Sequence, residues 1–412
     1  MKRTHVSTGN NLLYLFPVVI LCYTFTLLWG WIPYTRSIIT VFVGIVAAFA
    51  VSHSYFSNKT AGYLFVYALI LILNVFSGDA FYNSFRDVFT PIIEMLLPAL
   101  MVYGILAKGN EKSLKILVYI VLMMLIVNAF CSFLVDLVMP GSIRAIHGTI
   151  RATGEKTIAM SYYKMGLATY VMPHALPCII PILIMGIKLI KDKFTKLLMV
   201  VSLFACLLLV YLSGSTTPVL TAMVAVFLGI FTSKKTGAKQ MVTLGILFLL
   251  VYAILSSKDI MLPLLRDLDD LLNNEGYFHK KILSFEELIA YGETSGDMEE
   301  REDLYMITWK AIISNPIIGV DYETGGHSTL LDCWGRLGII GLIPFLLFII
   351  SQVKMSCQRI SKKSRLYYYE GVFVAFIMLV LKNVAGWESW LFLFTVLPLL
   401  TIYVERMGIE KK

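Results

Sequence analysis

The chain has 412 residues, of which 58% are hydrophobic and only 15% are charged, and its mean hydropathy is +0.77. Soluble domains usually carry about 25% charged residues, so this composition excludes an ordinary soluble enzyme. The net charge of +8 is unevenly distributed, because residues 257–328 hold fifteen acids and six bases while the rest of the chain is basic. Such a pattern is typical of a membrane protein with basic cytoplasmic segments, and nothing indicates a nucleic-acid-binding domain.

Apolar runs long enough to cross a bilayer as helices, about 20 residues each, recur along nearly the whole chain. They are too long and unbroken for the alternating strands of a membrane barrel. We therefore expect an all-α, polytopic protein with a single membrane domain over residues 1–412, whose first helix is uncleaved. About twelve transmembrane helices are expected, near residues 11–31, 37–52, 61–77, 88–106, 114–136, 166–187, 197–213, 216–232, 240–256, 331–352, 368–384 and 388–404.

The lysines and arginines predict the orientation of these spans. With both termini in the cytoplasm, inside segments hold 21 of the 35 basic residues and the short outer loops hold seven. Cytoplasmic loops carry such an excess of basic residues. None of the six cysteines falls in an outer loop, which argues against a disulfide-bonded ectodomain.

One span, 166–187, contains three prolines four residues apart: Pro173, Pro177 and Pro181. Proline removes a helix hydrogen bond, so this span is predicted to be kinked or broken. The span 88–106 similarly brackets Glu94 with two prolines. Ionisable groups inside a membrane suggest function, whereas kinks without a catalytic role are common in large helix bundles, and both interpretations stay open.

Two extracytoplasmic segments are long enough to hold structure: a basic loop at 137–165 and a large loop at 257–330. In the large loop, "LLRDLDDLL" predicts a short amphipathic helix on the membrane surface. A second helix, "EEREDLYMITWKAIIS", is expected to begin at Asp297 and to end at Asn315-Pro316. Its predicted apolar side consists of Leu304, Ile307, Ala311 and Ile312.

Three fragments carry polar or glycine motifs in a fixed order. Ser213-Gly214-Ser215 opens one span, the motif Asn-Pro-x-x-Gly follows at 315–319, and His327-Ser328-x-Leu330 leads into a span with Gly338 and Gly341. In this order the fragments resemble the O-antigen polymerase and O-antigen ligase superfamily of bacterial surface-polysaccharide assembly. The sequence departs from that pattern at Thr216, where the family has an arginine.

The resemblance implies a bacterial inner-membrane enzyme with a fold similar to GT-C-type membrane glycosyltransferases. Such a polymerase transfers a glycan from a polyprenyl diphosphate carrier to a sugar hydroxyl on a second carrier-linked repeat unit. Polyprenyl-diphosphate-linked oligosaccharide is then both donor and acceptor, and membrane lipids, a chain-length regulator and a flippase are the implied partners. Neither ATP nor another cofactor is expected, because no metal-ligand spacing and no nucleotide-binding loop are found.

This chemistry needs a base for the acceptor hydroxyl and fixed cations for the diphosphate. His327 is the first candidate for the catalytic base. An acid could serve instead, and the candidates are Asp321, Glu323 and Asp332. The diphosphate candidates are Arg144, Arg151, Arg301 and Arg336, with Arg86 behind them, and the candidates for sugar contact are Trp309, Ser215 and Ser328.

Each candidate also has a structural interpretation. His327 would then only cap a helix or lie at the interface, and Asp332 and Arg336 would form a structural pair four residues apart. Arg144 and Arg151 would bind lipid headgroups. Trp309 would anchor its helix at the membrane interface or pack in the core.

Two other functions remain open at the level of sequence. The first is an O-antigen ligase, which moves finished glycan to lipid A core or a similar acceptor; Thr216 and Arg336 argue against it, since ligase-like members have an acid at the position of Arg336. The second is a secondary transporter or a lipid-linked oligosaccharide flippase. The absence of an inverted repeat and the large one-sided loop argue against transport.

Overall fold

The computed structural model describes residues 54–76, 85–108, 111–138, 171–232, 258–271, 297–322 and 324–409, together with a few residues between 279 and 287. This part of the chain consists of helices with their connecting turns and loops and contains no strand, which confirms the all-α class. Six stretches are long and apolar enough to cross a membrane, and two shorter apolar helices accompany them. The expected spans 11–31, 37–52 and 240–256 lie outside the described residues, so the count of twelve stays a prediction.

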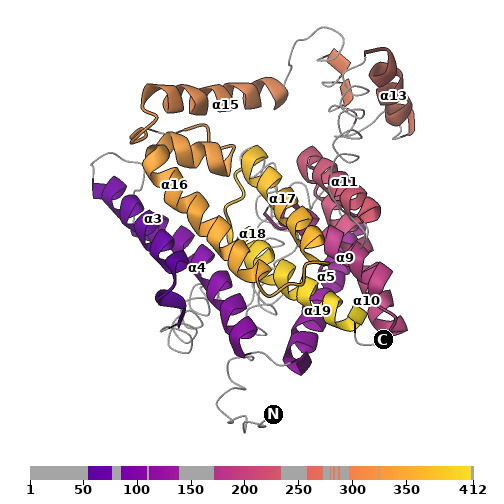
Figure 1. The fold of residues 1–412 in the computed structure, drawn as a ribbon. Helices are drawn as coiled ribbons and strands as arrows, with labels where there is room; N and C mark the ends of the chain where they lie inside the picture. Colours follow the sequence, from indigo (N-terminus) through magenta and orange to yellow (C-terminus); the bar gives the residue numbers. More distant parts are fainter. Residues whose placement is uncertain are drawn as a thin grey trace.

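The membrane helices form a bundle, and the helix α15 lies across one end of it (Figure 1). We call this end the α15 end. The helices of the bundle and of the large loop are α3 (Lys59–Phe76), α4 (Phe85–Lys108), α5 (Glu111–Val138), α8 (Val171–Ala175), η3 (Leu176–Ile179), α9 (Ile180–Leu189), α10 (Lys193–Leu212), α11 (Thr216–Phe231), α13 (Lys258–Leu271), α15 (Asp297–Ser314), α16 (Thr329–Cys357), α17 (Arg365–Leu381), α18 (Trp387–Leu391), η4 (Phe392–Val396) and α19 (Leu397–Ile409).

The last span, formed by α18, η4 and α19, is the centre of the bundle. Nearly all of its residues are buried, a far larger share than in the spans around it except the proline-rich one. Trp390 and Phe394 stack with ring centroids 5.4 Å apart, and Phe348 of α16 meets Phe394 edge to face at 5.6 Å. Large aromatic side chains contribute much apolar area, so this span is the core against which the other helices pack.

The three-proline span is broken, as the sequence predicts. α8 and α9 are joined by the single 3₁₀ turn η3, and Pro177 lies within that turn. Most residues of this span are buried, so its break lies inside the bundle. α4, in contrast, runs as one helix through Pro91 and Pro98.

A second break interrupts α16 at Gly338, whose backbone has φ 61° and ψ −170°. We call this break the elbow. It divides α16 into an outer segment, 329–337, and an inner segment, 339–357. The inner segment alone has 19 residues, about the length required to cross a bilayer. The expected span 331–352 therefore includes part of the outer segment, and the elbow was not predicted.

At the end of the bundle away from α15, a lysine fixes the last turn of α11. Lys188 Nζ donates hydrogen bonds to the carbonyl oxygens of Gly229 at 2.7 Å and Ile230 at 2.6 Å. The next residue but one, Thr232, hydrogen-bonds through its hydroxyl to the Glu370 carboxylate and accepts the Tyr367 hydroxyl at its carbonyl oxygen. α11 and α17 are therefore joined here, where α11 ends and α17 begins.

Candidate active site

The outer segment of α16 packs against α15. On α15 the contact face consists of Thr308, Ala311 and Ile312, all buried, with Leu304 half-buried beside them. A Cβ added at Gly335 of α16 would lie 3.6 Å from Thr308 and 3.7 Å from Ala311, which shows how closely the two helices approach. The predicted apolar side of α15 is confirmed at three positions and wrong at Ile307, which is 41% exposed because the buried face is centred on Thr308.

The Asn-Pro-x-x-Gly motif turns the chain back and fills the elbow of α16. The first two backbone amides after the elbow, those of Ile339 and Ile340, have lost their intrahelical partners. They donate instead to the carbonyl oxygens of Pro316 at 2.9 Å and Ile317 at 3.3 Å. On the other side of the elbow, the Val320 amide donates to the Gly335 carbonyl at 2.9 Å. The two segments thus satisfy each other's backbone groups, as buried backbone requires.

Two glycines make this joint possible. Gly319 has φ +89° and Gly338 has φ +61°, both in the left-handed region that disfavours side chains. A Cβ on Gly319 would overlap the backbone of Arg336, and a Cβ on Gly338 would overlap the carbonyl of Ile317. The glycines of both motifs therefore serve one joint.

The buried carboxylate of Asp332 organises the loop that precedes α16. Its Oδ2 accepts the Ser328 amide at 2.9 Å, and its Oδ1 accepts the Gly326 amide and the Thr308 hydroxyl, both at 3.1 Å. Thr308 also accepts the Gly325 amide at 3.0 Å. Asp332 thus fixes the backbone on both sides of residue 327 and ties it to α15.

His327 lies half-buried where three segments meet. The Tyr305 ring of α15 faces the imidazole edge to face, with centroids 6.3 Å apart. The Tyr305 hydroxyl donates to the Leu381 carbonyl of α17 at 2.7 Å. Just after His327, Thr329 donates its amide and its hydroxyl to the Lys382 carbonyl at 3.1 and 3.0 Å. The imidazole is thereby positioned by α15, α16 and the α17–α18 loop together.

Arg336 also faces this loop. Its Nε donates to the Thr324 hydroxyl at 3.2 Å, and the side chain is half-buried. Asp332 and Arg336 therefore each bind the 324–328 loop, at opposite ends of it. A guanidinium, a carboxylate-anchored loop and an imidazole are consequently gathered on the outer segment of α16 and the loop before it.

A family model described as O-antigen ligase matches residues 201–346. The match includes the Ser-Gly-Ser turn, the Asn-Pro-x-x-Gly motif, the His327 loop and the elbow. Through this segment the chain is similar to the O-antigen polymerase and ligase superfamily. Members of this superfamily are membrane enzymes of the glycosyltransferase type, acting as polymerases or ligases. A search of curated proteins found no match.

The superfamily's serine-rich turn is at the same end of the bundle as His327. The end of α11 lies beside the beginning of α17. The two helices are therefore antiparallel, and the first residues of α11 lie toward the end of α17, where the Lys382 carbonyl binds Thr329. Ser215 is the N-cap residue of α11 and is half-buried; its amide donates to the Ser213 hydroxyl at 3.3 Å. The contact of Ser215 with sugar stays a prediction.

Three further candidates are described but perform other tasks or stand apart. The buried Ser328 hydroxyl caps α16, since it accepts the Leu331 amide at 3.2 Å. Asp321 is exposed in the turn after Val320. Trp309 is 48% exposed, on a face of α15 that does not pack on α16. Their predicted roles as sugar contacts or bases are not tested by these positions.

The remaining candidates cannot be placed. Arg144, Arg151 and Glu323 lie outside the described residues, as does most of the basic loop 137–165. Arg86 and Arg301 lie on α4 and α15, and their side chains are outside the described part of the structure. Their predicted contacts with diphosphate stay predictions.

Sequence reasoning missed four residues that hold the His327 loop in place: Tyr305, Thr308, Thr324 and Lys382. One signal was available, because Thr308 is a lone hydroxyl in the row Leu304, Thr308, Ala311 on the buried side of a helix. A polar residue in such a row requires a partner. The roles of Tyr305 and Lys382 depend on contacts between segments about 50 to 80 residues apart, which no local pattern reveals.

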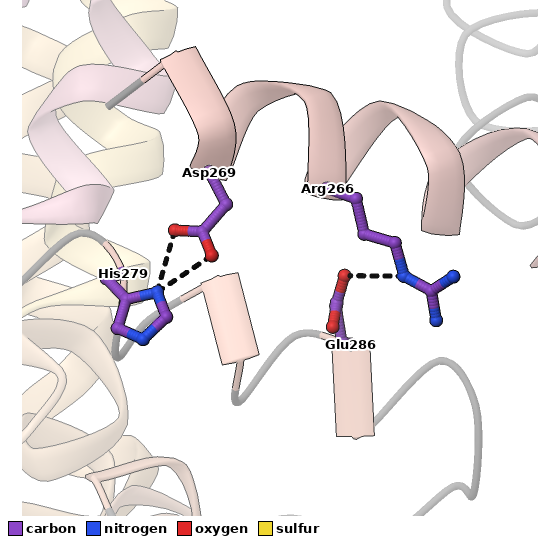
Figure 2. Close-up of polar contacts among 4 residues, drawn as sticks. All are labelled: Arg266, Asp269, His279 and Glu286. Atoms are coloured by element: carbon purple, nitrogen blue, oxygen red, sulfur yellow. Dashed lines mark hydrogen bonds and ion pairs between the residues drawn. The ribbon is translucent and has the colours of Figure 1, made fainter. Parts of the chain in front are cut away.

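The helix predicted in "LLRDLDDLL" is confirmed as α13, which lies beyond the α15 end of the bundle (Figure 1). Two polar contacts attach it to the residues that follow. Arg266 Nε lies 3.4 Å from Glu286, and His279 Nδ1 lies 2.7 and 2.9 Å from the two carboxylate oxygens of Asp269 (Figure 2). Within the described part of the chain no group of three potential metal ligands gathers, here or elsewhere.

Proposed function

We propose that this protein polymerises polyprenyl-diphosphate-linked oligosaccharide repeat units into O-antigen or capsular polysaccharide at the outer face of the bacterial cytoplasmic membrane. The observation that supports it most is the placement of His327. Its loop is fixed from both sides by Asp332 and lies beside the elbow, on the segment that matches the superfamily.

The proposed reaction transfers the growing glycan from its carrier to an acceptor. A hydroxyl oxygen of the acceptor repeat unit bonds to the anomeric carbon of the donor glycan. The bond from that carbon to the diphosphate oxygen breaks, and polyprenyl diphosphate leaves with the bonding electrons. The hydroxyl proton passes to His327, because imidazole is the side chain whose ordinary pKa lies nearest neutrality.

The leaving diphosphate requires cations beside this base. Arg336 is our first assignment, because its planar fork pairs with phosphate oxygens and it binds the same loop as His327. Lys382 is a second candidate that replaces the arginine absent at Thr216, since its backbone holds the residue next to Ser328. Asp332 acts as a positioning residue, because its carboxylate binds backbone amides rather than pointing to a substrate.

A ligase is the second candidate function, and the description of the matching family model favours it. Two residues favour the polymerase instead: Arg336, where ligase-like members of the superfamily have an acid, and Thr216, where they have an arginine. The two reactions share donor and leaving group, and differ only in the acceptor. The placement of His327 is equally compatible with both.

The deciding experiment uses purified full-length protein in liposomes with carrier-linked repeat units and no ion gradient. A ladder of longer carrier-linked chains is expected. If chains grow only when lipid A core is supplied and end on it, the protein is a ligase and polymerisation is wrong. If repeat units only cross the bilayer without growing, the protein is a flippase and the enzymatic proposal fails.

The His327→Ala variant tests the base. General-base catalysis typically contributes 10²–10⁴-fold, so we expect the initial rate of chain extension to fall by about that factor. The matched control is His279→Ala, which removes a histidine of the same large loop that contacts Asp269 and lies outside the site. A His327→Ala protein with full activity would remove the assigned role.

A further inference from the structure

Several apolar side chains are exposed along α15 and the elbow, with the exposed Lys310 beside them on α15. We call these apolar side chains the apolar strip, and its members are between 40% and 67% exposed. Exposed apolar areas of this extent are rare on water-facing surfaces and mark contact with a partner or a membrane. The members of the strip are Met306, Trp309, Ile313, Ile317, Ile318, Ile339, Ile340 and Ile343.

The two parts of the strip, on α15 and on α16, are adjacent because backbone hydrogen bonds join the two segments at the elbow. Pro316 and Ile317 accept the amides of Ile339 and Ile340, so the end of the α15 segment lies directly against the beginning of the inner segment of α16. Ile343 follows one turn further into that segment, which is long enough to span a bilayer. Exposed apolar residues there face acyl chains, and the strip extends this surface onto α15.

The exposed side of α15 is charged at its beginning and mainly apolar in its second half. Residues four and seven apart share a helix face, so Glu302, Met306 and Ile313 lie on one side of α15. Glu302 and Asp303 are exposed, as an aqueous helix start requires, whereas Met306, Trp309 and Ile313 are exposed apolar residues, with the exposed Lys310 beside them. Trp309 lies where this change occurs, and tryptophan is enriched at membrane–water interfaces.

We propose that the second half of α15 and the Asn-Pro-x-x-Gly turn are embedded in the bilayer leaflet at the α15 end, with the apolar strip in contact with acyl chains. The first half of α15 then lies in the aqueous phase. The strip adjoins the exposed apolar surface of the inner segment of α16, which spans the membrane. We therefore assign lipid, and not a protein partner, as its occupant. This inference does not depend on the proposed reaction.

One consequence concerns the depth of the elbow. If Ile317 and Ile340 contact acyl chains, the elbow lies at the boundary of the hydrocarbon, and the outer segment of α16 lies at the level of the headgroups. Asp332 and Arg336 then sit at headgroup depth. Trp309 serves as an interface anchor in this arrangement, which is one of the structural interpretations that the sequence offered for it.

The test measures the depth of single labelled residues. Full-length protein is prepared in nanodiscs of phosphatidylethanolamine and phosphatidylglycerol, with native cysteines replaced and a nitroxide attached to Ile313→Cys, Glu302→Cys or Ile343→Cys. Oxygen concentrates among acyl chains, and a nickel chelate stays in water. We expect a ratio of oxygen to nickel accessibility above one at 313 and 343, and below one at 302, on the same side of α15 as 313.

A ratio below one at position 313 would show that this face meets water and would overturn the proposal. Low accessibility to both reagents at 313 would show that protein covers the strip, which overturns it as well. If the cysteine-free protein does not fold, the native chain and Trp309→Phe are compared in brominated lipids. Brominated lipids should quench the fluorescence of the native chain more than that of Trp309→Phe, because Trp309 lies near the bromine atoms. Equal quenching of the two proteins would refute the proposal.

Discussion

The two helix breaks, between α8 and α9 and within α16, differ in the residue type that causes them and in the contacts that satisfy their backbone groups. The break in the α8–α9 span is made by proline and is bridged within its own chain segment by η3, deep in the bundle. The elbow of α16 is made by glycine and is completed by another segment, whose carbonyls accept the freed amides. The first break shapes one helix, and the second joins two.

The difference shows how a membrane protein places irregular backbone. Proline removes the amide, so a proline break leaves fewer groups to satisfy and is tolerated in an apolar environment. A glycine break leaves amides that need partners, and their partners become fixed at the same time. A glycine elbow is therefore suited to position polar residues from two segments, as it does for the His327 loop.

The largest effect is expected where the joint itself is blocked. In Gly338→Ala, the backbone at φ 61° and ψ −170°, a region essentially restricted to glycine, costs about 1–3 kcal/mol, and the Cβ overlaps the Ile317 carbonyl, so we expect little folded protein. Fluorescence-detected gel filtration after heating measures this. The control is Gly62→Ala on α3, where nothing lies within 4 Å and helix propensity predicts a gain of up to about 1 kcal/mol. Equal yields of folded protein and equal thermal stability of the two variants would contradict the role assigned to Gly338 in the joint.

A smaller effect is expected from Asp332→Asn, which keeps the shape of the side chain. The amide retains one acceptor oxygen and directs an NH₂ group toward donors, so one of the bonds to Ser328, Gly326 or Thr308 is lost at a cost of about 1–3 kcal/mol. If Asp332 only positions the loop, kcat for chain extension falls more than KM rises. Unchanged kcat and unchanged thermal stability would remove this role.

Thr308→Val tests the tie between α15 and the loop. The substitution leaves the Gly325 amide without its acceptor and removes one donor from Asp332, so we expect a loss of about 1–3 kcal/mol, at the lower end of the range for Asp332→Asn. The matched control is Thr221→Val on α11, whose hydroxyl bonds only to carbonyls of the preceding turn. Thermal unfolding of both variants in detergent provides the measurement. A larger loss in the control would contradict the assigned contact.

The smallest effect is expected from Pro177→Ala in the proline break. The turn η3 is held by packing on all sides, and removing proline acts mainly through the unfolded chain, so stability should change by about 1 kcal/mol or less. Chain extension should proceed at the unchanged rate, in contrast to the elbow variant. A strong loss of activity would mean that the proline break also positions the site.

Much of the fold followed from local pattern. Apolar run length predicted the six candidate spans that are described, the proline triplet predicted the break between α8 and α9, and Asn315-Pro316 predicted the end of α15. These features depend on properties of neighbouring residues, such as a missing amide or a run of apolar side chains. They are therefore visible without knowledge of the tertiary structure.

The site was predictable only in outline. His327 and the glycines at 319, 338 and 341 were visible as motifs, but the motif alone does not show that Gly319 and Gly338 belong to one joint. The pairing of Asp332 with Thr308, in place of the expected partner Arg336, depends on how α15 lies on α16. Contacts of this kind are set by packing between segments, for which the sequence gives no period or spacing.

The ammonium of Lys188 at the far end of the bundle has an effect on the site as well. By binding the final carbonyls of α11, it ties this helix to the end of α9, and the contacts of Thr232 with Glu370 and Tyr367 tie the same end to α17. A helix of 16 residues is about 24 Å long and stiff, so fixing one end also fixes the height of the other. The turn at Ser215 is thus kept at the same height along the bundle as the α17–α18 loop.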